Sequence, residues 1–184
     1  MANGTLKVEN IQTSSGSGTI TLGQSGETVA FGSGVTSKMN QPAFEAYLSA
    51  DQTVTDNVAT KAEIDTEVFD TDNCYDNTTN YRFTPTVAGK YFVYGGIRMQ
   101  SSSGGALAAV YTKIYKNGSA YRQSLADPVD NQGNSFSPTV SATMIMNGTT
   151  DYVELWGFNN VTGGTPRFES NEQAVYFGAY RIGA

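Results

Sequence analysis

The chain has 184 residues, a formal net charge of −6 and no histidine. Its acidic balance argues against a nucleic-acid partner, because phosphate binding needs clustered Lys and Arg. The lack of histidine removes the commonest general base and the commonest zinc ligand, so an enzyme is not expected. Every apolar run is far shorter than the roughly 18 residues of a membrane-spanning helix, so we expect no membrane insertion.

Composition predicts an all-β protein with many turns. Glycine (20) and tyrosine (11) are abundant, and charged residues make up only 15%, as is typical of short strands joined by turns. Cys74 is the single cysteine, so an intrachain disulfide is impossible, and we expect no cofactor. Met1 to Thr5 shows neither the basic start nor the apolar core of a secretory signal, so we expect folding in a cytoplasm.

Residues 1–41 differ in composition from the rest, being dominated by Gly, Ser and Thr. Short alternating runs recur within them, the last three at a step of nine residues. Their apolar positions are Leu6, Val8, Ile11, Ile20, Leu22, Val29 and Phe31. Each run is too small to bury its apolar face alone. Two interpretations stay open: an anchor or stem that becomes ordered in an assembly, which we favour, and a flexible linker.

The predicted head, 42–184, opens with an alternating strand at 42–49. A brief strand at 67–70 and a polar, turn-rich loop at 71–79 follow. Two aromatic-rich runs within 80–99 then flank a turn at 85–89, which predicts a hairpin.

The second of these runs is predicted to be a central strand. Tyr91 and Val93 would share one face, and Phe92 and Tyr94 the other. Because both faces are apolar or aromatic, the strand should be covered on both sides.

The remaining predicted strands are separated by clear turn signals, the strongest being Asn117-Gly118. They span 106–116, 120–124, 135–146, 152–158 and 174–182. No stretch shows helical periodicity. About eight to ten strands at this spacing predict a sandwich or jelly roll.

Five landmarks, in this order, resemble the globular head of complement component 1q, a relative of the tumour necrosis factor jelly rolls. They are Pro42 to Phe44; Asn73 with Tyr75-Asp76; Phe83-Thr84 with Gly89-Lys-Tyr91; Ile114-Tyr-Lys-Asn-Gly118; and Gly148 to Leu155 with Tyr176-Phe-Gly178. The resemblance covers about 42–184. It departs from the family pattern at Val93 and Ala179, where phenylalanines are usual, and at the inserted pair Thr149-Thr150.

The resemblance implies a jelly roll that assembles as a tight homotrimer, with both chain ends near its base. The residues agree, because the head has more aromatic surface than one small core can hide, and such surface is commonly buried at interfaces. The side chains expected in the trimer interface or the core are Phe83, Tyr91, Phe92, Tyr94, Tyr176 and Tyr180.

The stem, Gly4 to Val29, resembles the N-terminal segments of tailed-phage virion proteins, both fibres and capsid decorations. We therefore expect a virion protein, made in the host cytoplasm, that docks on another virion protein through 1–41. Its exposed head would adhere to a host cell-surface glycan or protein. Two alternatives are a bacterial lectin-like binding module without a virion role and a polysaccharide-degrading spike.

Individual polar and aromatic residues have competing interpretations. Asp70, Asp72, Asp76 and Glu67 form an acidic loop that calcium would suit, although solvated turn carboxylates are expected more often; Asp127 and Asp130 are weaker candidates. Trp156 is expected in the core rather than on a sugar-stacking surface. Arg98, Arg122, Arg167 and Arg181 are expected to pair with carboxylates across strands.

Overall fold

The computed structural model describes residues 41–183, except 105 and 129–132, together with Ile11, Ser25, Thr28 and Ser33. Ile11 is exposed. The other predicted anchor residues, Leu6, Val8, Ile20, Leu22, Val29 and Phe31, lie outside the described residues, as does Asp130. The anchor and the boundary at residue 41 therefore stay predictions.

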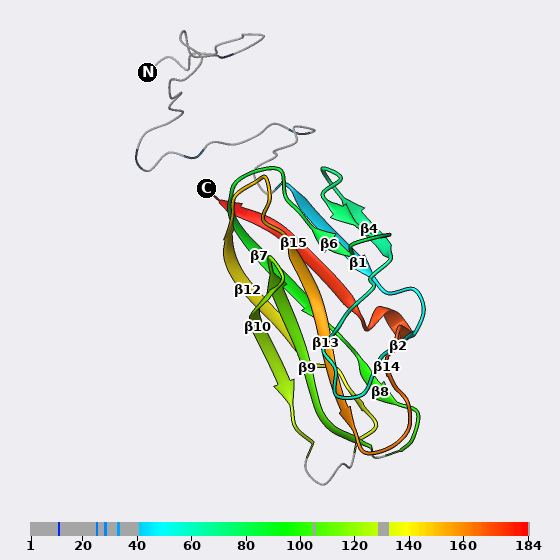
Figure 1. The fold of residues 1–184 in the computed structure, drawn as a ribbon. Coiled ribbons are helices and arrows are strands. Elements are labelled where there is room, and N and C mark those ends of the chain that lie inside the picture. The colour runs from blue at the N-terminus through cyan, green and yellow to red at the C-terminus, as the bar shows by residue number, and fades with distance from the viewer. Residues whose placement is uncertain are drawn as a thin grey trace. The chain divides into compact units, whose positions relative to one another are not determined.

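The head is built from antiparallel strands, which form three sheets (Figure 1). Sheet I has the order β12 (Thr139–Met146), β7 (Gly89–Gly96), β15 (Tyr176–Gly183), β1 (Ala43–Tyr47) and β4 (Thr66–Asp70). β7 lies between β12 and β15, which confirms the prediction of a central strand. β1 and β15 are paired with Ala43 opposite Tyr180, so the head begins and ends on neighbouring strands.

Sheet II has the order β10 (Ser119–Ala126), β9 (Leu107–Lys116), β13 (Val153–Val161), β6 (Arg82–Phe83) and β5 (Tyr75–Asp76), and β3 (Thr60–Lys61) also pairs with β13. Sheet III has the order β11 (Ser135–Phe136), β8 (Met99–Ser101), β14 (Pro166–Phe168) and β2 (Gln52–Thr53). A single 3₁₀ turn, η2 (Asn171–Gln173), precedes β15 in the described part of the chain.

The core forms where the alternating faces of the sheets meet. β12 shows the cause most clearly, because its even-numbered residues from Val140 to Met146 are buried and its odd-numbered ones are exposed. Phe44 of sheet I stacks on Phe83 of sheet II, with ring centroids 4.6 Å apart, and meets Phe177 edge-on at 5.2 Å. The Phe44–Phe83 contact joins the two sheets, and the packed antiparallel sheets confirm the predicted all-β jelly roll.

The predicted hairpin at 80–99 is wrong. β6 pairs with β5 and β13 in sheet II, whereas β7 belongs to sheet I. The turn between them therefore carries the chain across the sandwich instead of back along the same sheet.

The predicted strand at 135–146 is two strands, β11 and β12, which belong to different sheets. Pro138 lies at the break and has no N–H to give to a ladder. Its carbonyl instead accepts hydrogen bonds from the Ile97 N–H at 3.5 Å and the Thr112 hydroxyl at 2.8 Å. β14 was not predicted, because it has only three residues and begins at the end of a Gly/Thr-rich stretch, 159–166, that indicates a loop.

Candidate functional site

Four aromatic side chains lie together on the outer face of sheet I, on its neighbouring strands β7 and β15. Phe92 lies opposite Tyr180 across the β7–β15 pair, and their ring centroids are 5.6 Å apart. Tyr94 lies 5.9 Å from Phe92 and 6.4 Å from Tyr176, again between centroids. We call these four residues the aromatic face. Tyr180 is 38% exposed, and the other three are partly buried.

Two glycines let these rings lie against the backbone. A Cβ atom at Gly178, which faces Tyr94, would come within 2.4 Å of the tyrosine Cζ. A Cβ atom at Gly96, which faces Tyr176, would come within 2.8 Å of that ring. The hydroxyl of Tyr94 also donates a hydrogen bond to the Glu45 carboxylate. Burial and this carboxylate raise the pKa of Tyr94, so the hydroxyl stays a neutral donor.

Phe83 and Tyr91 lie elsewhere, fully buried between the sheets. The Tyr91 hydroxyl donates to the Val87 carbonyl at 2.7 Å, and burial raises the pKa of Tyr91 to about 12. Of the six residues expected in the interface or core, two are thus in the core and four form the aromatic face. The role of that face as an interface stays a prediction.

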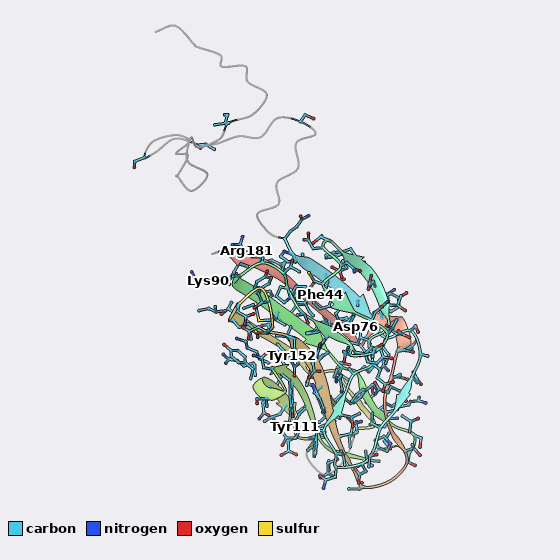
Figure 2. The ribbon with its side chains drawn as sticks, turned by 45° about the horizontal axis from the view of Figure 1, so that its top comes forward. Phe44, Asp76, Lys90, Tyr111, Tyr152 and Arg181 are labelled. Carbon is cyan, nitrogen blue, oxygen red and sulfur yellow. The ribbon has the colours of Figure 1, made fainter. Side chains whose placement is uncertain are left out.

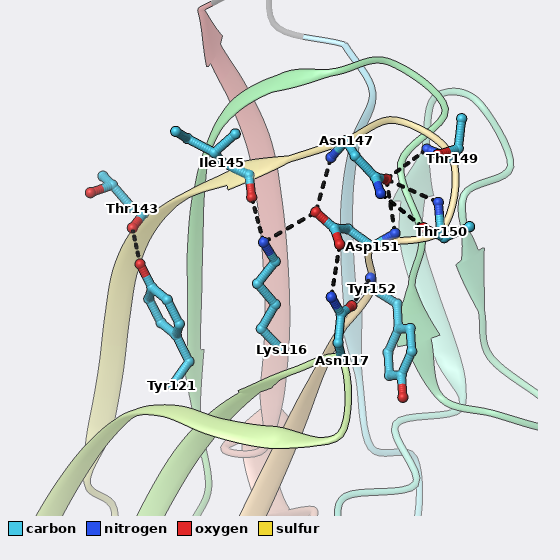
Figure 3. Close-up of polar contacts among 10 residues, drawn as sticks. All are labelled: Lys116, Asn117, Tyr121, Thr143, Ile145, Asn147, Thr149, Thr150, Asp151 and Tyr152. Atoms are coloured by element: carbon cyan, nitrogen blue, oxygen red, sulfur yellow. Dashed lines mark hydrogen bonds and ion pairs between the residues drawn. The ribbon is translucent and has the colours of Figure 1, made fainter.

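The edge strand β12 is covered by side chains from sheet II (Figure 3). Tyr121 donates its hydroxyl to the Thr143 carbonyl at 3.1 Å, and Lys116 Nζ donates to the Ile145 carbonyl at 2.7 Å. Ile145 and Ile182, which are 68% and 48% exposed, line a cavity of about 460 Å³ beside these contacts. Because two edge carbonyls are occupied, β12 is a poor template for an added strand.

Two of the motifs that carry the family resemblance bind each other at the same end of the sheets. Asn117 Nδ2 donates to Asp151 Oδ1 at 2.7 Å, and the Tyr152 N–H donates to Asn117 Oδ1 at 2.9 Å (Figure 3). Hydrogen bonds from Asn117 and Lys116 lower the pKa of Asp151. The carbonyl oxygen of the Asn147 side chain accepts from the N–H groups of 149–151. The turn thereby accommodates the two inserted threonines.

Two carboxylates of the acidic loop accept hydrogen bonds from backbone N–H groups of the loop itself. Asp76, labelled in Figure 2, accepts from the N–H groups of Thr78, Thr79 and Asn80 and from the Asn80 side chain. These hydrogen bonds hold the pKa of Asp76 far below its usual range. Asp70 accepts from the Tyr75 N–H at 2.7 Å. Within the described residues, no three acidic or Cys side chains gather as a metal site would require.

Trp156 was expected in the core, and this expectation is wrong. It alternates with the buried residues Val153, Leu155 and Gly157 along β13 and points away from the core. Its ring stacks on Tyr115 with centroids 4.7 Å apart, and its Nε1 donates to Glu154 Oε2 at 3.0 Å.

The arginines behave differently from one another. Arg98 pairs with Glu169, and Arg167 pairs with Asp51 and Glu169, as expected. Arg181 instead donates its Nε to the Ala88 carbonyl at 3.2 Å. Arg122 is exposed and forms no ion pair with the described residues.

No family model and no curated protein matches the sequence. Within the described residues, no helix is long and apolar enough to cross a membrane. Solved structures do match this chain, and what they share with it is the fold.

The globular domain of zebrafish complement 1qA protein matches with a TM-score of 0.54 and 13% identity, over 77% of this chain and 98% of that one. Eiger TNF from S. frugiperda matches with a TM-score of 0.53 and 11% identity, over 79% and 95%. Murine APRIL matches with a TM-score of 0.56 and 8% identity, over 79% and 100%. The chain thus has the jelly-roll fold shared by complement 1q heads and tumour-necrosis-factor-like proteins.

Proposed function

We propose that the chain is a non-enzymatic structural protein of a phage particle. In this proposal 42–184 form a homotrimeric adhesive head, and 1–41 dock on another virion protein as a fibre or decoration anchor. The aromatic face of sheet I carries the trimeric part of the proposal. Tyrosine and phenylalanine side chains that a protomer leaves partly exposed on a sheet are the kind that interfaces bury.

A second apolar patch supports a ring of protomers. Tyr121 and Leu125 on the edge strand β10 are 46% and 55% exposed. They are separate from the aromatic face, which lies on the other sheet. A contact between two different patches is heterologous, and heterologous contacts generate closed rings when the rotation between protomers closes. The fold shared with complement 1q heads and tumour-necrosis-factor-like proteins supports a ring of three.

The virion role is supported by the sequence of the stem. Its alternating runs, at a step of nine residues, are too short to bury an apolar face alone and suit docking on an assembly. The lectin-like alternative has the same head and no particle. That alternative would be favoured if the gene for this chain lay apart from phage head and tail genes. The polysaccharide-degrading spike would be favoured if the protein lowered the viscosity of a solution of capsule polysaccharide.

The experiment is a mass measurement at micromolar concentration on the whole chain and on Tyr180→Asp. The unaltered chain is expected to have the mass of a trimer. Tyr180→Asp places a charge in the aromatic face and is expected to give folded monomers, because desolvating an unpaired carboxylate at an interface is costly. A monomeric unaltered chain would refute the trimeric head.

The particle role needs a separate measurement, namely electron microscopy of phage whose copy of this protein carries a bulky label. Density from the label on capsid or tail is expected. Particles without label, from cells that make the labelled protein, would refute the virion role.

A further inference from the structure

The outer face of sheet II carries aromatic rings and cationic side chains side by side. Trp156 lies opposite Lys113 and Lys61, and the preceding outward residue, Glu154, lies opposite Tyr115 and Arg82. We name the following six residues the sheet II platform: Arg82, Tyr111, Lys113, Tyr115, Trp156 and Phe158. All six are partly exposed, and they come from three neighbouring strands, β6, β13 and β9.

The rings of the platform form two pairs. Tyr115 stacks on Trp156, with centroids 4.7 Å apart and ring planes 22° apart. Tyr111 meets Phe158 edge-on, with centroids 5.2 Å apart. Because successive outward residues of a strand are about 7 Å apart, the two pairs follow each other along β13 and β9 as one continuous surface.

Two cations of the platform lack a carboxylate partner. Lys113 Nζ lies over the rings of Tyr111 and Phe158, 5.1 and 5.7 Å from their centroids. The Arg82 guanidinium lies over the ring of Tyr152, 4.5 Å from its centroid. Neither side chain forms an ion pair or a hydrogen bond with another described residue, so their donors remain available to a ligand.

The nearby carboxylates are already occupied. Glu154, opposite Arg82 across the sheet, pairs with Lys61 Nζ at 2.7 Å and accepts from the Trp156 indole. Asp76, opposite Arg82 on the other side, accepts from the amides of its own turn. Within the described residues, the platform therefore keeps two cations without an ion-pair partner on a chain whose net charge is −6.

The space around Arg82 is open and polar. A hollow of about 400 Å³ adjoins it, and Asn73, Asn77 and Thr84 are among the side chains that line it. Arg82 and Lys113 lie on strands on either side of β13 and two residues apart in register, which places their Cα atoms roughly 12 Å apart. A ligand that meets both cations must extend across the rings between them.

We propose that the sheet II platform binds an acidic polysaccharide whose sugars carry carboxylate groups. The apolar C–H face of a sugar ring packs on Trp156 and Tyr115, while carboxylates of the polymer accept hydrogen bonds from Arg82 and Lys113. This inference rests on the proposed adhesive role of the head and names its ligand class and site. It uses the outer face of β6, β13 and β9, whereas the proposed ring contact uses the aromatic face of sheet I and the edge strand β10, whose Leu125 lies opposite Tyr111 at the border of the platform.

Trp156 is the only tryptophan of the chain, so its fluorescence reports directly on the platform. The experiment titrates the whole chain with oligosaccharides of polygalacturonate, a uronic-acid polymer, and with neutral dextran of matched length. We expect a saturable change in Trp156 emission with the uronic-acid probe that weakens with salt, and none with dextran.

Charge-neutral variants locate the binding. Arg82→Gln and Lys113→Gln are each expected to weaken binding of the uronic-acid probe about tenfold, through loss of a charge-assisted hydrogen bond. Arg122→Gln is the matched control, because it removes an exposed cation of β10 outside the platform and is expected to leave affinity unchanged. Thermal unfolding of each variant verifies that the head remains folded.

Three results would overturn the site: no saturable emission change or binding heat with the uronic-acid probe, equal binding of dextran, or equal loss in Arg122→Gln. The mass of each sample, measured in parallel, separates this inference from the proposed function. A trimer that does not bind refutes the site alone, whereas a monomer that binds refutes the trimeric head alone.

Discussion

Gly178 lies opposite Tyr94 in the β7–β15 pair and leaves no room for a side chain under that ring. Gly178→Ala would place a Cβ atom 2.4 Å from Tyr94 Cζ, so the ring must lift away from the sheet and from its hydrogen bond to Glu45. We expect a loss of about 1–3 kcal/mol in the free energy of unfolding, as for other overpacked sites, measured by chemical denaturation.

Gly163→Ala is the control for this prediction, because a Cβ atom there meets nothing within 4 Å. It should change the free energy of unfolding little. Equal stability of the two variants would contradict the close approach of Tyr94 to the backbone.

Asp76 stabilises its turn only while it is ionised. Its depressed pKa means that this stabilisation is present above the unfolded pKa of about 4 and is lost as the pH falls below it. We expect Asp76→Asn to lower the free energy of unfolding by about 1–2 kcal/mol at pH 7. The difference from the unaltered chain should shrink as the pH falls from 5 to 2, in denaturation curves recorded across that range.

Asp72→Asn tests whether the pH-dependent loss of stability in Asp76→Asn comes from the hydrogen bonds with the turn amides rather than from removal of a negative charge. Asp72 has the same charge and lies in the same loop, but its carboxylate accepts from the Thr71 hydroxyl at 3.0 Å and from none of the turn amides at 78–80. A pH dependence for Asp72→Asn as large as that for Asp76→Asn would contradict the assignment.

At the scale of elements, the two faces of β7 have different roles: one packs in the core of the head, and the other belongs to the proposed trimer interface. Tyr91 is fully buried and Tyr94 lies on the aromatic face, although both are tyrosines of one strand. Tyr91→Asp should prevent folding, because it buries an unpaired carboxylate in the core. Tyr94→Asp should leave the protein folded but release monomers from the trimer.

Circular dichroism and mass measurement distinguish the two outcomes. Folded trimers in Tyr94→Asp would contradict the proposed interface, and a folded Tyr91→Asp would contradict the assignment of that side chain to the core.

Local patterns predicted strands well and their partners poorly. Alternation identified β1, because a strand with one buried face must repeat with period two, and apolar, aromatic-rich runs between turn signals identified β7 and β13. The short turn after Phe83 suggested a hairpin, yet sequence spacing does not reveal whether the chain returns along one sheet or crosses to the other. The spacing of the strands left a sandwich or a jelly roll, and the order of motifs along the whole head indicated the jelly roll, in which the chain crosses between sheets.

The outward position of Trp156 was missed for a related reason. β13 alternates Val153, Leu155 and Gly157 with Glu154, Trp156 and Phe158, so both sets contain apolar residues. The choice between the two faces depends on which one meets sheet I. The glutamate in the second set was the signal for the outer face, since it needs a charged partner that the core does not supply.

At the scale of the whole molecule, the two sheets present different outer surfaces. Sheet I presents four tyrosine and phenylalanine rings, two of which lie against glycines, and the charged residues beside them are Glu45, which accepts a hydrogen bond from Tyr94, and Lys90 at the start of β7. Sheet II presents rings interleaved with Arg82 and Lys113. Protein interfaces deplete lysine at their centres, whereas ligand surfaces for anions require cations. This difference is the physical basis for proposing that the aromatic face of sheet I takes part in self-association and that the platform on β6, β13 and β9 binds the ligand.

A trimer whose dissociation accompanies unfolding must gain stability with concentration. Each tenfold rise in chain concentration favours the trimer by about 0.9 kcal/mol per protomer, two thirds of the usual 1.4 kcal/mol. A head of about 140 residues has an unfolding entropy of roughly 0.3 kcal/mol/K, so the midpoint should rise by about 3 °C per tenfold. Calorimetry of the whole chain at several concentrations measures this rise. Tyr180→Asp, as a folded monomer, should melt at one temperature throughout, and an unaltered chain that did the same would contradict coupled assembly and folding.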